Sequence, residues 1–141
     1  MALARVCEAL DMTEPMNALV DRFLEAIEHG DVDTVLSIYA DDARIWHNFD
    51  QVEVSPRANC RQIKWFASRL SGMKYTDIRR IEFPGGIVQQ HVLRGTAPNG
   101  ATIAVHAILR IDIVDGRIGR LEEYLDPAQA ADLSAPAGAT R

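Results

Sequence analysis

The sequence has no long apolar run, few cysteines and few aromatic residues. Of its 141 residues, 2 are cysteine and 6% are aromatic. No apolar run reaches the roughly 18 residues that a membrane-spanning helix needs, so we do not expect a membrane protein. Cys7 and Cys60 lie too far apart in the sequence for a metal-binding or redox motif. We expect both to be free thiols, and therefore a cytoplasmic protein.

Positive charge is not gathered in any part of the chain. There are 15 Lys and Arg against 20 Asp and Glu, a formal net charge of -5. Because nucleic acids and anionic membranes are bound by clustered Lys and Arg, we expect neither as a partner. The four histidines show no metal-ligand spacing, and the sequence has no phosphate-binding glycine loop. We therefore expect no metal and no cofactor.

Helical patterns fill the first half of the chain. Apolar residues recur every three or four positions, which places them on one face of a helix, in the segments 16–27, 32–39 and 60–70. Gly30 is placed to end the first helix, and Asp31 to cap the second. Ser55 followed by Pro56 is typical of the start of a third helix. We interpret residues 43–48 as a short strand.

After Gly72 the apolar period becomes two, which is typical of β-strands. The pattern predicts strands near 74–83, 87–96, 101–113 and 117–124. Asn99-Gly100 and Asp115-Gly116 predict type I′ hairpin turns, since both central residues of that turn need positive φ. The expected fold class is α+β, with three N-terminal helices packed on one face of a curved, mostly antiparallel sheet.

No linker or internal repeat divides the chain. We therefore expect one domain over residues 14–133. Residues 1–13 would form an N-terminal arm or extend the first helix. The small and polar residues 134–141 would form a disordered tail.

The predicted strand at 101–113 has one wholly apolar face and one mixed face. Every second residue from Ile103 to Ile113 is apolar, so this face should contact the helices or line a pocket. The other face includes Ala104 and Ile108, which makes it too apolar for ordinary solvent-exposed surface. We expect that face to contact a second subunit in a homodimer, with His106 at the interface.

The most informative stretch is Trp46-His47-Asn48-Phe49-Asp50. Hydrogen-bonding side chains crowded between aromatic rings are typical of a pocket rather than of a plain core. His47 is a candidate general base or acid, because a neutral imidazole titrates near neutral pH. Its alternative role is to order the loop after the strand. Asn48 and Asp50 would bind a ligand or orient His47, or else form a turn with the local backbone.

Four segments of the chain resemble one protein superfamily. They are FLEAIEHGD at 23–31, YADDARI at 39–45, and DGRI at 115–118 followed by EEYLD at 122–126. These segments, in this order, resemble the superfamily of nuclear transport factor two, ketosteroid isomerase and SnoaL-like polyketide cyclases. The resemblance implies a cone-shaped fold that encloses a deep, largely apolar pocket. It also implies a dimer through the outer face of the sheet.

Ketosteroid isomerases give the first detailed comparison. The segment from Tyr39 to Ala43 is similar to the segment that precedes their general-base aspartate. This resemblance places His47 at the base position and Ala107 near the position of the oxyanion-stabilising acid. Alanine cannot donate a hydrogen bond, so the chain departs from the isomerase pattern there.

Limonene epoxide hydrolases give the second comparison. Trp46 and Asn48 match the spacing of the aromatic residue and the asparagine that bind the attacking water in those enzymes. Residues 122–126 are similar to the segment that carries their carboxylate base, which places Glu123 at the base position. Tyr124 is expected to line the core or the pocket.

Alternation along the strands leaves two questions open. On a regular strand His47 points to one face, and Trp46 with Asn48 to the other, so only one set can face a pocket. In the same way His91 and Gln90 point to opposite faces. Gln90 falls where the epoxide hydrolases carry part of an Arg/Asp pair.

We therefore expect a cofactor-independent enzyme acting on a small hydrophobic molecule such as a polyketide, terpenoid or steroid. The reaction would be an isomerisation, cyclisation, dehydration or hydration driven by proton transfer. The predicted catalytic residues are His47, Glu123 and Asn48, and the predicted substrate-binding residues are Trp46, Asp50, His91, Gln90, Ala107 and Tyr124. The alternatives are a non-catalytic protein that binds a small hydrophobic ligand, and a protein-interaction dimer.

Overall fold

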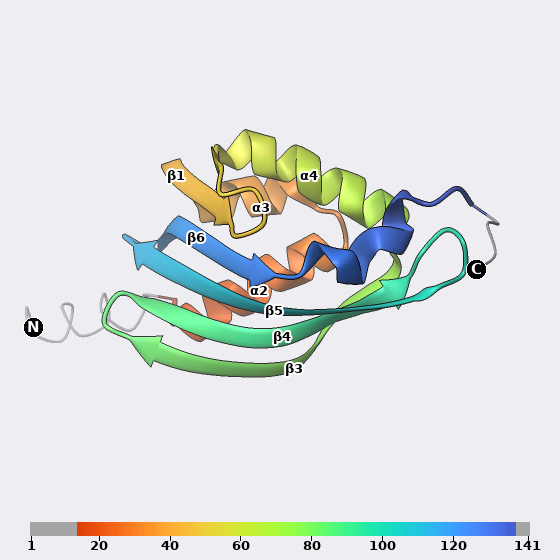
Figure 1. Cartoon of the computed structure of the whole chain (residues 1–141). Coiled ribbons are helices and arrows are strands. Elements are labelled where there is room, and N and C mark those ends of the chain that lie inside the picture. Colours follow the sequence, from red (N-terminus) through yellow and green to blue (C-terminus); the bar gives the residue numbers. More distant parts are fainter. Residues whose placement is uncertain (1–13, 138–141) are drawn as a thin grey trace, which may run out of the picture.

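The computed structural model describes residues 14–137 and confirms the α+β fold class (Figure 1). The predicted arm at 1–13 and the last four residues of the predicted tail lie outside the described residues, while Ser134 ends a 3-10 helix. In chain order the elements are α2 (Met16–Glu28), α3 (Val32–Ile38), β1 (Tyr39–His47), β2 (Glu53–Val54), α4 (Pro56–Arg69), β3 (Ser71–Phe83), β4 (Gly86–Thr96), β5 (Thr102–Val114), β6 (Arg117–Leu125) and η1, the 3-10 helix (Pro127–Ser134).

The helix ends follow the predicted capping residues. Gly30 follows α2 with a φ of 65°, a left-handed conformation that glycine adopts without steric cost. The Asp31 side chain accepts a hydrogen bond from the Thr34 amide at the start of α3. The Ser55 hydroxyl accepts one from the Ala58 amide at the start of α4. Local sequence therefore determines where these helices begin and end.

The six strands form one sheet in the order β2-β1-β6-β5-β4-β3. β1 pairs with β6 in parallel, whereas the other neighbours are antiparallel. The predicted start of the first strand at residue 43 was wrong, because β1 begins at Tyr39. Tyr39 is buried and continues the apolar period of the preceding helix, which is why the sequence pattern includes it there. In the structure its backbone is already extended and pairs with Ile118.

The two predicted type I′ turns have different outcomes. Asp115 and Gly116 both have positive φ, 51° and 74°, so this prediction is confirmed. In the turn between β4 and β5 only Gly100 has positive φ, and its amide donates to the Ala97 carbonyl at 2.9 Å. This turn is therefore not type I′. Pro98 is its second residue, and the proline ring fixes φ at a negative value.

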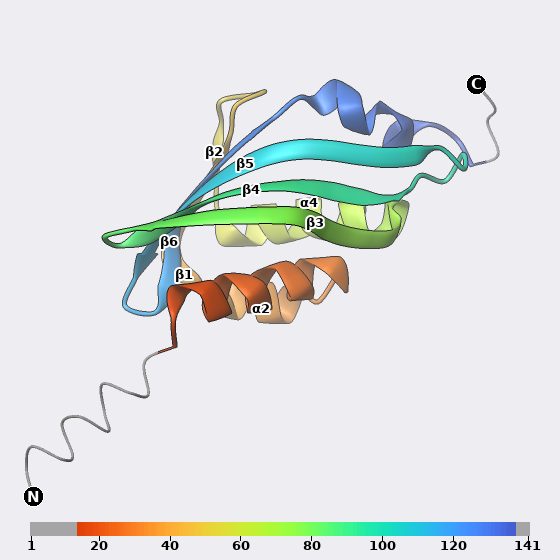
Figure 2. The ribbon, with the colours of Figure 1, turned by 90° about the horizontal axis from the view of Figure 1, so that it is seen from below.

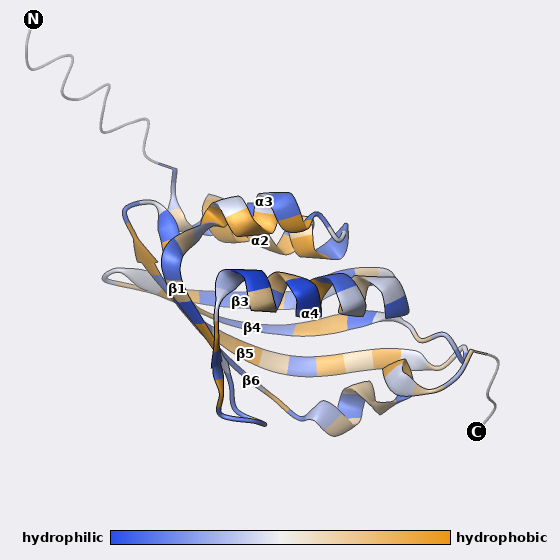
Figure 3. Cartoon of the chain, turned by 90° about the horizontal axis from the view of Figure 1, so that it is seen from above, coloured by the Kyte–Doolittle hydropathy of each residue, from blue (hydrophilic) through white to orange (hydrophobic). Residues whose placement is uncertain are grey.

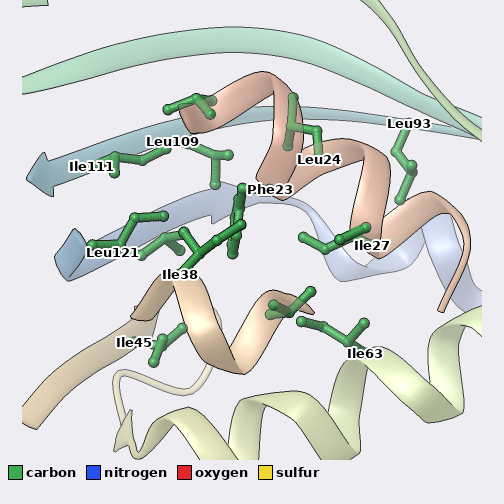
Figure 4. Packing of buried hydrophobic residues seen from close by; sticks show 14 of the residues in the cluster. Phe23, Leu24, Ile27, Ile38, Ile45, Ile63, Leu93, Leu109, Ile111 and Leu121 are labelled. Carbon is green, nitrogen blue, oxygen red and sulfur yellow. The ribbon is translucent and has the colours of Figure 1, made fainter. Parts of the chain in front are cut away.

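Helices α2, α3 and α4 lie over one face of the sheet (Figures 2 and 3). The hydrophobic core fills the space between these layers, and Figure 4 shows Phe23 of α2 and Ile38 of α3 close to Leu109 and Leu121 of the sheet. The apolar face of β5 points toward the helices, as predicted, and Ile111 on it is fully buried. No helix in residues 14–137 is long and apolar enough to cross a membrane.

Candidate functional site

A cavity of about 680 Å³ lies between the helices and the inner face of the sheet. Its wall is mostly aliphatic and aromatic. The polar and ionisable side chains on the wall are Tyr39, His47, Asn59, Arg61, Gln62, Tyr75, His91 and Glu123. Phe49 and Trp65 line the cavity and are both about half exposed. The cavity therefore opens to solvent between α4 and the loop that follows β1. Its size and apolar wall suit a small organic molecule.

The strand register brings His47 and Glu123 together. His47 on β1 lies beside Glu123 on the parallel neighbour β6, and Glu123 lies opposite Leu109 on β5. His47 Nε2 is 3.2 Å from Glu123 Oε1, and these side chains are 14% and 21% exposed. A partly buried carboxylate is costly unless a partner offsets its desolvation. The imidazole is that partner, and the pair faces the cavity.

Asn48 fastens β1 to β6 immediately beyond this pair. The backbone N–H of Asn48 donates to the backbone carbonyl of Glu123 at 3.0 Å. The side-chain Oδ1 of Asn48 accepts from the backbone N–H of Leu125 at 2.9 Å. The contact of Asn48 with water or substrate stays a prediction; in the structure the Leu125 amide holds its Oδ1, and Asn48 does not line the cavity. Asn48 fixes the register that holds His47 beside Glu123.

The structure also corrects the placement of Trp46, Asp50, Gln90 and Tyr124, none of which lines the cavity. Trp46 packs edge-to-face on Tyr124 on the opposite face of the sheet, with ring centroids 5.4 Å apart. Gln90 is exposed on that same face. Asp50 accepts a hydrogen bond from the Val52 amide, the turn role that was its alternative. Alternation on regular strands explains the placement of Trp46, Gln90 and Tyr124, since the inward residues are their neighbours.

His91 and Ala107 lie on the cavity wall, as predicted, and are opposite each other on β4 and β5. The His91 ring packs edge-to-face on Tyr75 at a centroid distance of 4.9 Å. Burial lowers the pKa of His91, which favours the neutral imidazole. Ala107 contributes no polar atom beyond its backbone, so hydrogen-bonding chemistry on this part of the wall falls to His91.

Sequence reasoning missed five polar residues of the wall, which are Tyr39, Asn59, Arg61, Gln62 and Tyr75. Tyr39 donates a hydrogen bond from its hydroxyl to Asn59 Oδ1 at 2.8 Å, and both side chains are buried. Burial raises the pKa of Tyr39 and of Tyr75 well above the usual range, so both phenols stay neutral donors. One signal was available for Asn59, which lies four residues before Ile63 and so shares the apolar face of its helix.

Within residues 14–137 no group of three or more His, Cys, Asp or Glu side chains is arranged to hold a metal ion. The chemistry that the wall itself offers is proton transfer at His47 and Glu123, and hydrogen bonding from neutral donors. Most of the wall is apolar, so it would fit the shape of a bound molecule and exclude water from it.

Comparisons with known proteins agree with this architecture. The family model described as the SnoaL-like domain matches residues 20–121. None of the curated proteins matches the sequence significantly.

Solved structures match over most of the chain. A provisionally assigned polyketide cyclase from Xanthomonas campestris pv. campestris is 20% identical, with a TM-score of 0.72 over 84% of this chain and 96% of that chain. A provisionally assigned SnoaL-like polyketide cyclase from Shewanella putrefaciens is 12% identical, with a TM-score of 0.73 over 92% of each chain. A provisionally assigned isomerase from Bacillus subtilis is 14% identical, with a TM-score of 0.73 over 88% and 94%. At these identities the likeness shows the fold alone.

Proposed function

The chain belongs to the SnoaL-like domain family, and from this premise we propose that it is a cofactor-independent enzyme acting on a small hydrophobic molecule. The observation that carries the proposal is the contact of His47 with Glu123 on the wall of a mostly apolar cavity. The names of two similar structures include polyketide cyclase and that of a third includes isomerase. These names agree with a polyketide substrate and with cyclisation or isomerisation. Terpenoid and steroid-like molecules are further substrates of the proposed class.

The proposed chemistry is proton transfer between the substrate and the pair. His47 removes a proton from carbon or oxygen of the bound molecule, and Glu123 stabilises the imidazolium that forms. The same imidazolium then returns the proton to a second position, so the protein ends each turnover unchanged. An apolar wall favours this step, because it excludes water that would otherwise compete for the proton. Dehydration and hydration use the same pair with a hydroxyl as leaving or attacking group.

Exchange in D2O tests the proposal with simple ketones in place of the natural substrate. Cyclic ketones that fit the cavity are incubated with the protein, and loss of the proton next to the carbonyl is followed by NMR. We expect wild-type protein to accelerate the exchange of at least one ketone, and His47→Gln to abolish the acceleration. A His47→Gln protein with full exchange activity would contradict the role of His47. Binding of ketones without any exchange would instead favour the alternative of a non-catalytic ligand-binding protein.

We also propose that the protein is a homodimer through the outer face of its sheet. Ile81, Ile108 and Tyr124 on the long strands are exposed large hydrophobic residues, at 71%, 40% and 45%, and a hollow on this face is lined by His106, Ile108 and Tyr124. Light scattering should give twice the chain mass, and Ile108→Glu should reduce it to that of one chain. A monomeric wild-type protein would contradict the dimer and leave the third alternative, a protein-interaction dimer, without support.

We propose a cytoplasmic location, because the free thiol of Cys60 fits a reducing compartment.

A further inference from the structure

A chain of polar side chains leads from α2 to the cavity through a fully buried glutamine. Arg80 Nη1 lies 2.7 Å from Asp21 Oδ1 on α2. Arg80 Nε donates to Gln89 Oε1 at 2.7 Å. Gln89 Nε2 lies 2.8 Å from His91 Nδ1. The Asp21 side chain is 68% exposed and the Arg80 side chain 12%, whereas Gln89 is 0% exposed and His91 4%. The contacts at the Gln89 and His91 end of this chain are therefore shielded from water and are not replaced by solvent.

The chemistry of these groups allows only one direction for each hydrogen bond. A guanidinium has donors and no acceptor, so the Gln89 atom that faces Arg80 is the carbonyl oxygen. The NH2 group of Gln89 then faces His91, and an amide NH2 only donates. His91 Nδ1 must accept, which means that it carries no proton. A flipped Gln89 amide would place two donors against each other at Arg80. The proton of neutral His91 therefore resides on Nε2.

Because Gln89 holds Nδ1, the Nε2 atom is the ring nitrogen of His91 that is left for a ligand in the cavity. His91 lies on the cavity wall, and its ring is held against Tyr75 in an edge-to-face contact. No hydrogen bond to Nε2 is formed within residues 14–137. Burial favours the uncharged ring, and the positive charge of Arg80 acts in the same direction against the opposing effect of Glu123. The cavity wall thus carries a neutral N–H donor with no acceptor among the described residues.

We propose that Arg80 and Gln89 are positioning residues that hold His91 as a neutral Nε2–H donor, and that this donor binds a carbonyl oxygen of the molecule in the cavity. The inference rests on the proposed function in one respect, namely that the cavity takes a small and mostly apolar molecule. It adds the substrate class, which is a hydrophobic carbonyl compound. A neutral donor binds the carbonyl before proton removal, and binds the enolate oxygen more strongly once negative charge develops there.

The first experiment determines the His91 tautomer in ligand-free protein by NMR of nitrogen-15-labelled histidines. We expect the pattern of a neutral ring with the proton on Nε2. In Gln89→Glu the group facing Nδ1 only accepts, so the proton should move to Nδ1 or the ring should become charged. Gln90→Glu is the matched control, the same change one residue away on the outer face, and should leave His91 unaltered. Wild-type His91 protonated on Nδ1 would overturn the proposal.

A second variant covers the case in which Gln89→Glu does not fold. Gln89→Met keeps the volume and removes the donor, so His91 should populate both tautomers. An unchanged Nε2–H tautomer in Gln89→Met would show that Gln89 does not position the ring.

The second experiment measures binding of 1-indanone and of indane, which differ in the carbonyl group. We expect the ratio of 1-indanone affinity to indane affinity to be roughly two- to tenfold larger in wild-type protein than in His91→Phe. This is the range given by one net hydrogen bond. Phenylalanine keeps an aromatic ring against Tyr75 and removes the donor. An equal ratio in both proteins would overturn the carbonyl contact. This readout needs no turnover, so it is independent of whether His47→Gln alters proton exchange.

Discussion

Strands β1, β4 and β6 have one face toward the cavity and one face on the outside of the sheet. On β1, β4 and β6 the residues His47, His91 and Glu123 point into the cavity. Their direct neighbours Trp46, Gln90 and Tyr124 lie on the outer face of the sheet, and Gln90 and Tyr124 are exposed there. Both sets combine polar groups with aromatic rings, so composition does not distinguish them.

The difference lies in the burial of the paired polar groups. Inward-facing pairs are enclosed, since Gln89 and His91 are 0% and 4% exposed and the side chains of His47 and Glu123 are 14% and 21% exposed. Outer-face charges pair closer to solvent, as Arg120 and Glu122 do with side chains that are 33% and 25% exposed. Buried polar groups without a partner are strongly destabilising, whereas exposed pairs contribute little. Paired polar groups at a largely apolar wall are therefore the feature that marks the site, and matched substitutions on the two faces test it.

The largest difference is expected for two histidines. His47→Gln should lower the rate of proton exchange by about 10²- to 10⁴-fold, the usual contribution of a general base. His106→Gln makes the same change on the outer face, where His106 is exposed, and should leave the rate unchanged. The measurement is NMR exchange in D2O on a ketone that wild-type protein turns over. Equal losses in both proteins would remove the functional distinction between the faces.

The second difference concerns two isoleucines on β5. Ile111 is fully buried and Ile108 is 40% exposed. Ile111→Ala should lower the free energy of unfolding by about 2–5 kcal/mol through lost burial and a cavity. Ile108→Ala should change it by no more than about 0.5 kcal/mol in dilute protein. Urea unfolding gives both values, and a large concentration-dependent loss in Ile108→Ala would indicate that a second subunit covers the outer face.

The third difference is between adjacent glutamates on β6. Glu123→Gln removes the charge beside His47, and should reduce the exchange rate roughly 10- to 100-fold because a charge-assisted contact contributes about 1.5–3 kcal/mol. Glu122 contacts Arg120 at 2.8 Å on the other face. Glu122→Gln should therefore retain the wild-type rate. If the Glu123→Gln protein is as active as wild type, Glu123 has no part in proton transfer, and His47 alone performs it.

The smallest effect is a difference in the pH dependence of stability. Burial lowers the pKa of His91 below its ordinary value of 6.5, so below that pH the unfolded state binds a proton that the folded state does not. Stability should therefore fall as the pH decreases from about 6.5 toward the folded-state pKa. His91→Phe should flatten this part of the profile, and His106→Gln should not. Thermal unfolding between pH 7 and pH 5 measures the slopes.

Several features of the fold were predictable from local sequence. The caps at Gly30, Asp31 and Ser55 were confirmed, because each uses only neighbouring backbone groups. Period-two alternation placed the four long strands within a few residues of their observed ends. The turn at Asn99-Gly100 was mispredicted because Pro98 precedes it and fixes a different backbone conformation.

The site was less predictable, since it depends on contacts between distant residues. Within the stretch 46–50, only His47 and Phe49 reach the cavity. Alternation showed that His47 and Trp46 must face opposite ways, but both faces combine ring and polar groups, so the sequence could not decide between them. Tyr39 and Asn59 were missed because their hydrogen bond joins positions 20 residues apart.

By itself the sequence determined the α+β class, the helix caps and the alternation that separates neighbouring side chains. These depend on backbone preferences and on the period of apolar residues, both of which are local. Only the tertiary structure decided that His47 rather than Trp46 faces the cavity, that Asn48 bonds the backbone of β6, and that Gln89 lies between Arg80 and His91. The physical reason is that strand register and helix packing set which polar groups meet, and a buried polar group is stable only where its partner is present.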